Sequence, residues 1–254
     1  MSISSAAELL GMQAVSTAVA ITLKKMREYA RPGMSTLELD QYGASILESF
    51  GARPAPKLTY GFPGYTCISV NQEVAHGIPS ATKVLTSGDL VNIDVSAELN
   101  GFWSDNGGSF VLGEDLHGHE RLVQTSKAIL KKAIEMIRPG MRIAEMGRVM
   151  EQSAKKEGFR VIRNLTGHGI GRQLHEYPHS VANYYDVLNR DRFRKNMVVA
   201  IETFISTGAS RAREAEDGWT LYTGDGTYVA QHEHTIVVTE SAPLILTAGN
   251  DIWN

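Results

Sequence analysis

The sequence predicts an α+β fold in which two similar halves share one central sheet, with helices outside. Three observations support this prediction. A helix–turn–helix pattern occurs twice, strand-like segments follow each copy, and the central strand pair is joined by the turn dipeptide Asn100-Gly101. Asn-Gly is the strongest short signal for a hairpin, because a type I′ turn needs positive φ at both central positions.

The repeat has a constant offset of 107 residues. Leu23-Lys24-Lys25 recurs at 130–132, and Arg31-Pro32-Gly33-Met34 recurs at 138–141. Two single matches keep the same register, Glu38 with Glu145 and Gly51 with Gly158. We therefore interpret residues 1–254 as a single domain with an internal pseudo-repeat, its halves at about 1–115 and 116–254.

Each half begins with two expected helices. The spans are residues 5–29, 35–51, 120–137 and 143–157. Capping-box spacing marks the starts at Ser5 and Ser35, and Pro-Gly or Gly follows the ends. Strands are expected at 66–70, 90–99, 102–112, 161–165, 197–206, 220–222 and 228–238. Residues 71–80 and the Gly-rich segment 166–172 are interpreted as loops.

Composition limits the classes of function. The chain has 254 residues, a net charge of −3 and no basic block, which argues against nucleic-acid recognition. No uninterrupted apolar run reaches about 18 residues and no basic leader precedes one, so we expect neither a signal peptide nor a membrane span. The single cysteine, Cys67, excludes an intramolecular disulfide and favours the cytoplasm. Its default role is that of a small buried apolar side chain.

The expected hairpin brings two carboxylates together. In a two-residue turn Ser96 faces Asp105, and Asp94 lies on the same sheet face because side chains alternate. The two aspartates are then diagonal neighbours whose backbone positions are at most about 7–8 Å apart. Their carboxylates repel each other, which favours a cation between them. A solvated pair on an exposed edge is the alternative.

Two glutamates stand in apolar strands of the second half. Glu202 ends the apolar run 197–201, and Glu233 lies within 229–238. A carboxylate in such a strand must be paired, protonated or metal-bound. If Glu233 points inward, the alternation turns His232 and His234 to the other face, so these histidines are not expected to be ligands.

Two further histidines stand near glycines. His168 lies in the Gly-rich segment, where glycines let the backbone approach a bound group, and His175 follows it. A phosphate-binding loop is a weaker interpretation, because the P-loop Lys-Ser/Thr is missing and the glycine spacing differs. The candidate ligands thus form an oxygen-rich set that suits Mg, Mn, Fe, Co or Zn. They are Asp94, Asp105, His168, Glu202 and Glu233. Four carboxylates balance two divalent ions about 3.5–4 Å apart better than one.

These residues, in this order, resemble the type I methionine aminopeptidases, which have the pita-bread fold. The matching segments are Cys67-Ile68-Ser69-Val70-Asn71, His76-Gly77-Ile78-Pro79, Val91-Asn92-Ile93-Asp94-Val95, Asp105, Gly167-His168-Gly169-Ile170-Gly171-Arg172, His175-Glu176, Ile201-Glu202 and Gln231-His232-Glu233-His234-Thr235. The resemblance covers nearly the whole chain. It implies a mostly antiparallel, curved central sheet.

The resemblance also implies an activity and its residues. The five candidate ligands would hold two divalent ions (Co, Mn, Fe, Zn or Ni) that activate a bridging water, and N-terminal methionine would be removed before a small second residue. Asp94 would chelate one ion, and Asp105 and Glu233 would bridge both. Glu202 would take the proton, His175 would stabilise the tetrahedral intermediate, and His76 would assist the departing amine. Phe62, Cys67 and Trp219 would form the methionine pocket.

The implied partners are peptide or nascent-chain N-termini, with the ribosome as a candidate meeting place. We also expect the protein to be a monomer in the cytoplasm that binds neither membranes nor nucleic acid. The chain departs from the family where Thr203-Phe204 follows Glu202 in place of proline, and where Thr59 and Leu174 stand at positions that are often aromatic. Two alternatives stay open, an X-Pro-type pita-bread peptidase and a non-catalytic peptide-binding module of the same fold.

Overall fold

A computed structural model describes residues 1–253 of the chain. Its main sheet is mostly antiparallel and follows the order β1-β4-β5-β12-β9-β7-β8, with β2, β6 and β13 paired at its flanks. The central strands are β4 (Leu90–Leu99), β5 (Phe102–Val111), β12 (Val229–Val237), β9 (Val198–Ser206), β7 (Thr166–Gly169) and β8 (Glu176–Ala182). The flanking strands are β1 (Arg53–Pro54), β2 (Cys67–Val70), β6 (Arg160–Val161) and β13 (Leu244–Ile245). A second, small sheet joins β10 (Arg213–Glu214), β11 (Leu221–Tyr222) and β3 (Glu73–Ala75).

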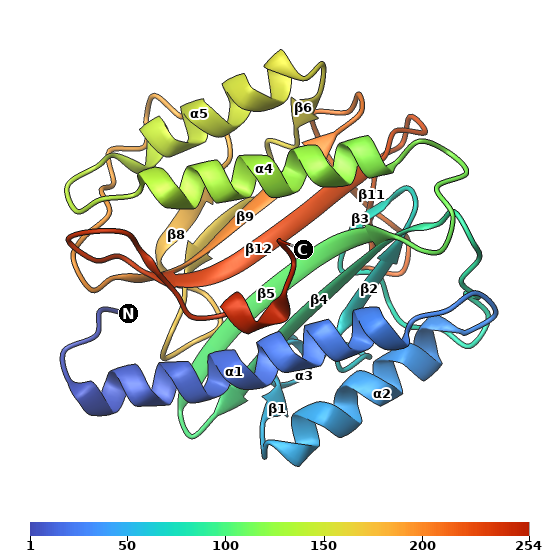
Figure 1. Cartoon of the computed structure of the whole chain (residues 1–254), viewed down its shortest axis with the longest axis horizontal. Helices are drawn as coiled ribbons and strands as arrows, with labels where there is room; N and C mark the ends of the chain where they lie inside the picture. The colour runs from blue at the N-terminus through green and yellow to red at the C-terminus, as the bar shows by residue number, and fades with distance from the viewer. Residues whose placement is uncertain (254) are drawn as a thin grey trace.

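Two helix pairs cover one face of the main sheet (Figure 1). The first pair is α1 (Ala6–Tyr29) and α2 (Thr36–Ser49), and the second is α4 (Glu120–Met136) and α5 (Ile143–Lys156). α1 packs on β4 and β5, whereas α4 packs on β9 and β12. These four helices confirm the expected spans to within two residues at each end. Two short helices, α3 (Ala55–Tyr60) and η1 (Ala248–Asn250), complete the fold.

The 107-residue offset is visible in the backbone. The bounds of α5 are those of α2 plus 107, and the glycines before the two helices, Gly33 and Gly140, have φ of +88° and +87°. The amide of Gly33 donates to Leu85 O, and that of Gly140 donates to Phe193 O. In α2 the Ser35 side chain caps the helix and Glu38 reaches back to it, as the capping-box spacing predicts.

By length and composition alone, α1 is apolar enough to cross a membrane. The fold accounts for this apolarity in another way, because α1 is a core helix against the sheet. Its inward side chains include Met12, Val15, Leu23 and Met26, each fully buried.

The central hairpin has the predicted register. Leu99 pairs with Phe102 and Ser96 pairs with Asp105, with Asn100 and Gly101 both at positive φ. On the other side of β5 lies β12, whose partner is β9. The β9–β12 register places Glu202 directly opposite Glu233, so their side chains emerge on the same face of the sheet.

Several expectations about strands and loops were wrong. The strand predicted at 161–165 is present only as the short β6, and residues 166–169 of the predicted loop form β7, which holds His168 in a strand. Glycine allows this because a Cβ at Gly167 would lie 2.4 Å from Ala200 O of the neighbouring strand. The strand predicted at 197–206, by contrast, is confirmed as β9, with Glu202 in its interior. The prediction missed α3, β1, β3, β8, β10 and β13.

Candidate functional site

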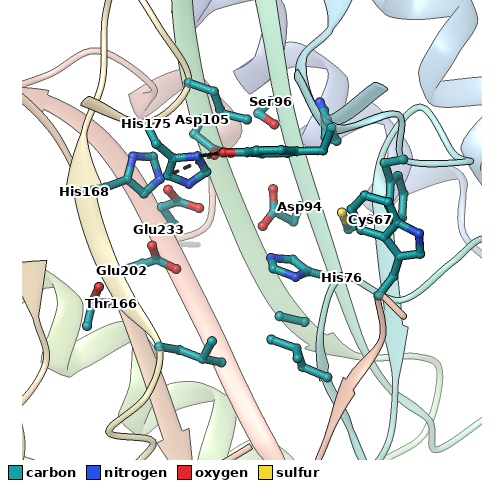
Figure 2. Close-up of a pocket in the computed structure, with 18 of the residues that line it drawn as sticks. Cys67, His76, Asp94, Ser96, Asp105, Thr166, His168, His175, Glu202 and Glu233 are labelled. Carbon is teal, nitrogen blue, oxygen red and sulfur yellow. Dashed lines mark hydrogen bonds and ion pairs between the residues drawn. The ribbon is translucent and has the colours of Figure 1, made fainter. Parts of the chain in front are cut away.

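A cavity of about 510 Å³ opens on the sheet face opposite the four long helices. All ten site residues proposed from the sequence line it, and Figure 2 labels all of them except Phe62 and Trp219. They are Phe62, Cys67, His76, Asp94, Asp105, His168, His175, Glu202, Trp219 and Glu233. The cavity has a polar wall formed by the sheet and an apolar wall formed by loops and β2.

Neighbouring strands supply the four carboxylates of the polar wall. Asp94 lies on β4, Asp105 on β5, Glu233 on β12 and Glu202 on β9. Asp105, Glu202 and Glu233 are buried, and Asp94 is partly buried. Figure 2 shows their side chains converging on one space within the cavity.

Burying four carboxylates together is unfavourable unless their negative charge is neutralised. Burial raises the pKa of Asp94 to about 6, and it raises the pKa of Asp105, Glu202 and Glu233 well above their ordinary range. The mutual repulsion of the carboxylates raises the pKa of these last three further. Two buried oxygens, Asp105 Oδ1 and Glu233 Oε1, have no hydrogen-bond partner among the described residues.

Asp105, His168 and Glu233 form a group whose ligand atoms all lie within 4.8 Å of one another. His168 Nε2 is 3.9 Å from Asp105 Oδ2, and His168 Nδ1 is 3.0 Å from its neighbour's carbonyl, Gly169 O. Only a protonated Nδ1 can donate to that carbonyl, so the lone pair is on Nε2 and faces the carboxylates. Oxygen-rich donors with one imidazole and two unsatisfied buried oxygens fit divalent cations.

Two other histidines line the cavity without belonging to that group. The His175 ring stacks at a tilt against His168, with ring centroids 4.0 Å apart. His76 follows β3 with φ of +54°, a left-handed conformation that is uncommon for histidine. Burial lowers the pKa of both, so each is a neutral imidazole at pH 7.

The apolar wall faces the carboxylates. Phe62 and Trp219 meet edge to face with ring centroids 5.3 Å apart, and Cys67 lies beside Asp94 on the paired strand β2. Leu174 and Phe204 also line the cavity. Burial raises the pKa of the Cys67 thiol well above its usual range, so this side chain acts as an apolar surface.

Two of the positions that depart from the family pattern, Thr203 and Thr59, lie outside the cavity lining. Thr203 points away from the cavity, and its hydroxyl lies 2.7 Å from Ser126 on α4. Thr59 does not line the cavity, whereas the next residue, Tyr60, does. Sequence reasoning missed Tyr60, because its partner His175 is 115 residues away.

His232 and His234 face the helices, as the alternation predicts. His232 Nδ1 is 2.9 Å from Ser126 Oγ, and His234 Nδ1 is 2.8 Å from Thr247 Oγ1. Burial lowers the pKa of both imidazoles, and that of His234 falls to about 3. Neither histidine lines the cavity.

Residues 11–240 match the model of metallopeptidase family M24. The chain belongs to this family. It is 50% identical over 240 residues to methionine aminopeptidase 2 of Bacillus subtilis, covering 94% of this chain and 96% of the relative. It is 40% identical to a methionine aminopeptidase of Staphylococcus epidermidis, covering 96% and 97% of the two chains.

Two solved structures show how closely the fold is shared. The methionine aminopeptidase of Thermotoga maritima superposes with a TM-score of 0.93 at 37% identity, covering 97% of this chain and 99% of that one. The prolidase of Pyrococcus furiosus gives a TM-score of 0.77 at 22% identity, and only 65% of it is covered. The prolidase shows the shared fold alone.

Proposed function

We propose that this M24 peptidase removes the N-terminal methionine from peptides and nascent proteins, with a preference for a small second residue. The observation that carries the proposal is the convergence of four carboxylates and His168 in a cavity with an aromatic wall. The 50% identity to a methionine aminopeptidase over most of both chains supports it. X-Pro-type activity is less favoured, because the prolidases are only 22% identical to the chain, against 37% for the methionine aminopeptidase of Thermotoga maritima.

We infer that two divalent ions occupy the polar wall, held by Asp94, Asp105, His168, Glu202 and Glu233. Four carboxylates carry a charge of −4, which two ions balance and one does not. Co, Mn, Fe, Zn and Ni all suit these donors. When bound, such ions lower the pKa of a water and polarise a carbonyl group.

The roles of the side chains follow from their places around this wall. Glu202, deprotonated in the ion-loaded cavity, would accept the proton that the attacking water releases. His175 would donate a hydrogen bond to the oxyanion of the tetrahedral intermediate, and His76 would assist the departing amine. The carboxylates that hold the ions would place one of them where it can bind the neutral N-terminal amine of the substrate, which would restrict cleavage to the first residue.

The apolar wall would receive the methionine side chain. Phe62, Cys67 and Trp219 supply an aromatic and sulfur-containing surface that suits a flexible thioether. We expect Trp219→Ala to raise KM for a Met-Ala peptide about tenfold with a smaller change in kcat, since this contact is made in the ground state as well as in the transition state. Steady-state kinetics on the metal-loaded protein would measure this. A fall in kcat with an unchanged KM would contradict the assignment.

We further propose that residues 1–254 form one catalytic domain whose pseudo-symmetric halves meet near residue 115. The site supports this view, because β4 and β5 from one half and β9 and β12 from the other supply its carboxylates. We also propose that the protein is a cytoplasmic monomer that acts on the N-termini of nascent chains as they emerge from the ribosome.

A peptide panel tests the proposed function. Peptides beginning Met-Gly, Met-Ala, Met-Leu and Leu-Ala would be incubated with protein reconstituted with Mn or Co. We expect release of free methionine from the first two and little cleavage of the others. If every peptide stays intact under each metal, the proposal is wrong, and cleavage of an X-Pro peptide instead would favour the prolidase-type activity.

A further inference from the structure

We propose that Tyr60 is a positioning residue that fixes the tautomer of His175, so that His175 Nε2–H faces the reacting carbonyl. This inference rests on the proposed function and concerns a residue outside the family motifs. The phenolic Oη of Tyr60 lies 2.5 Å from His175 Nδ1, and the two ring centroids are 5.8 Å apart. No other hydrogen bond to the His175 ring occurs among the described residues.

The fold holds Tyr60 in place. It is the last residue of α3, which begins after Pro54 and ends at Gly61 with φ of +72°. The Gly61 amide donates to Lys57 O at 3.1 Å, which closes the last turn of the helix. The helix directly follows β1, which pairs with β4, and its closed last turn presents the half-exposed phenol at the cavity mouth.

A hydrogen bond between a phenol and an imidazole can run in either direction, and the donor and acceptor strengths of the two groups favour one of them. Beyond His175, the cavity contains His168 and the buried carboxylates of Asp105 and Glu233. Because bound ions would balance the charge of these carboxylates, the donor strengths of the two groups decide: a phenol O–H is a stronger donor and a weaker acceptor than a neutral imidazole. Nδ1 then carries the lone pair, and the Tyr60 hydroxyl donates to it.

This direction matches the role proposed for His175. A neutral imidazole stabilises an oxyanion only if the nitrogen facing the substrate bears the proton. A tyrosine hydroxyl has an ordinary pKa of about 10, so at pH 7 it is protonated and able to donate. Without the hydroxyl, the two neutral tautomers of His175 compete, and part of the protein presents a lone pair to the carbonyl oxygen.

Tyr60→Phe tests the inference, because it removes the hydroxyl and keeps the ring. We expect kcat for a Met-Ala peptide to fall about tenfold while KM changes by less than about threefold, since the interaction strengthens in the transition state. Tyr65→Phe is the matched control. Tyr65 belongs to the same segment, but its ring lies over Lys57 and does not line the cavity.

Two further measurements separate positioning from a general structural effect. In the His175→Ala background, Tyr60→Phe should cause no additional loss, because the two residues act as a unit. Nitrogen-15 NMR of the zinc-loaded protein should show His175 protonated at Nε2, and Tyr60→Phe should shift that ring toward a mixture of tautomers. The NMR comparison does not depend on turnover, so it tests Tyr60 even if the methionine panel is negative.

The inference is overturned if His175 carries its proton on Nδ1 in the unaltered protein. It is equally overturned if Tyr60→Phe leaves both kcat and the tautomer unchanged. An equal additional loss in the His175→Ala background would show that Tyr60 acts on another group.

Discussion

Replacing Glu202 by glutamine is expected to lower kcat/KM for a Met-Ala peptide by about 10³-fold or more. Glu202 lies buried on β9 opposite Glu233, where it is placed to be both a ligand and the proton acceptor. General base catalysis alone contributes about 10²- to 10⁴-fold, and a disturbed ligand adds to the loss. Glutamine keeps the shape and hydrogen-bonding reach of the side chain but cannot accept the proton.

The measurement is steady-state turnover at saturating Mn, with the metal content of the variant determined in parallel. Glu135→Gln on the exposed face of α4 is the matched control, because it removes the same charge far from the cavity. Thermal unfolding checks that both variants fold. Turnover within tenfold of the unaltered protein in Glu202→Gln would remove Glu202 from the proposed chemistry.

Local signals in the sequence were sufficient to predict the polar wall. The Asn100-Gly101 turn determines the hairpin register, and alternation then places Asp94 and Asp105 on one face. The 107-residue repeat indicates that a second strand pair exists, and the apolar strands around Glu202 and Glu233 show which carboxylates are buried. Each of these inferences depends on short-range periodicity or on a repeated register.

Other features depend on packing, which no short segment encodes. Gly167 and Gly169 predict a loop when they are considered alone. In the fold they let β7 approach its neighbours, because a Cβ at Gly169 would lie 2.3 Å from Tyr177 O. A glycine-rich strand between two partners has the same local sequence as a loop, and only the neighbours distinguish the two.

The Tyr60–His175 contact could not be predicted for a related reason. Pro54 and Pro56 indicate a break in regular structure, yet the short helix α3 forms there and packs against β1 and β4. The direction of a side chain at the end of such a helix follows from tertiary contacts. No spacing rule connects residues 60 and 175.

Removal of the metal is expected to abolish turnover and to make the protein less stable as the pH rises. EDTA-treated protein should leave Met-Ala intact, and Mn or Co should restore cleavage. In the metal-free protein the four cavity carboxyl groups have pKa values raised by burial, that of Asp94 to about 6. They therefore keep protons to higher pH in the folded chain than in the unfolded chain, where carboxyl groups titrate near 4. Their contribution to stability is present below pH 4 and is lost as the pH rises through the folded pKa values.

Asp105→Asn isolates this effect, because it removes one buried charge from the cluster. In the metal-free state at pH 7, its Tm is expected to exceed that of the unaltered protein, and the difference should disappear near pH 4.

Metal at 100 times its Kd should stabilise the unaltered protein by about 2.7 kcal/mol, which is about 5–10 °C in Tm for a chain of this size. Asp105→Asn should show much less of this shift, and Glu135→Gln should behave like the unaltered protein. A metal-free Tm that does not depend on Asp105 at pH 7 would mean that the four carboxylates do not repel one another, and the electrostatic reason for two ions would then be lost.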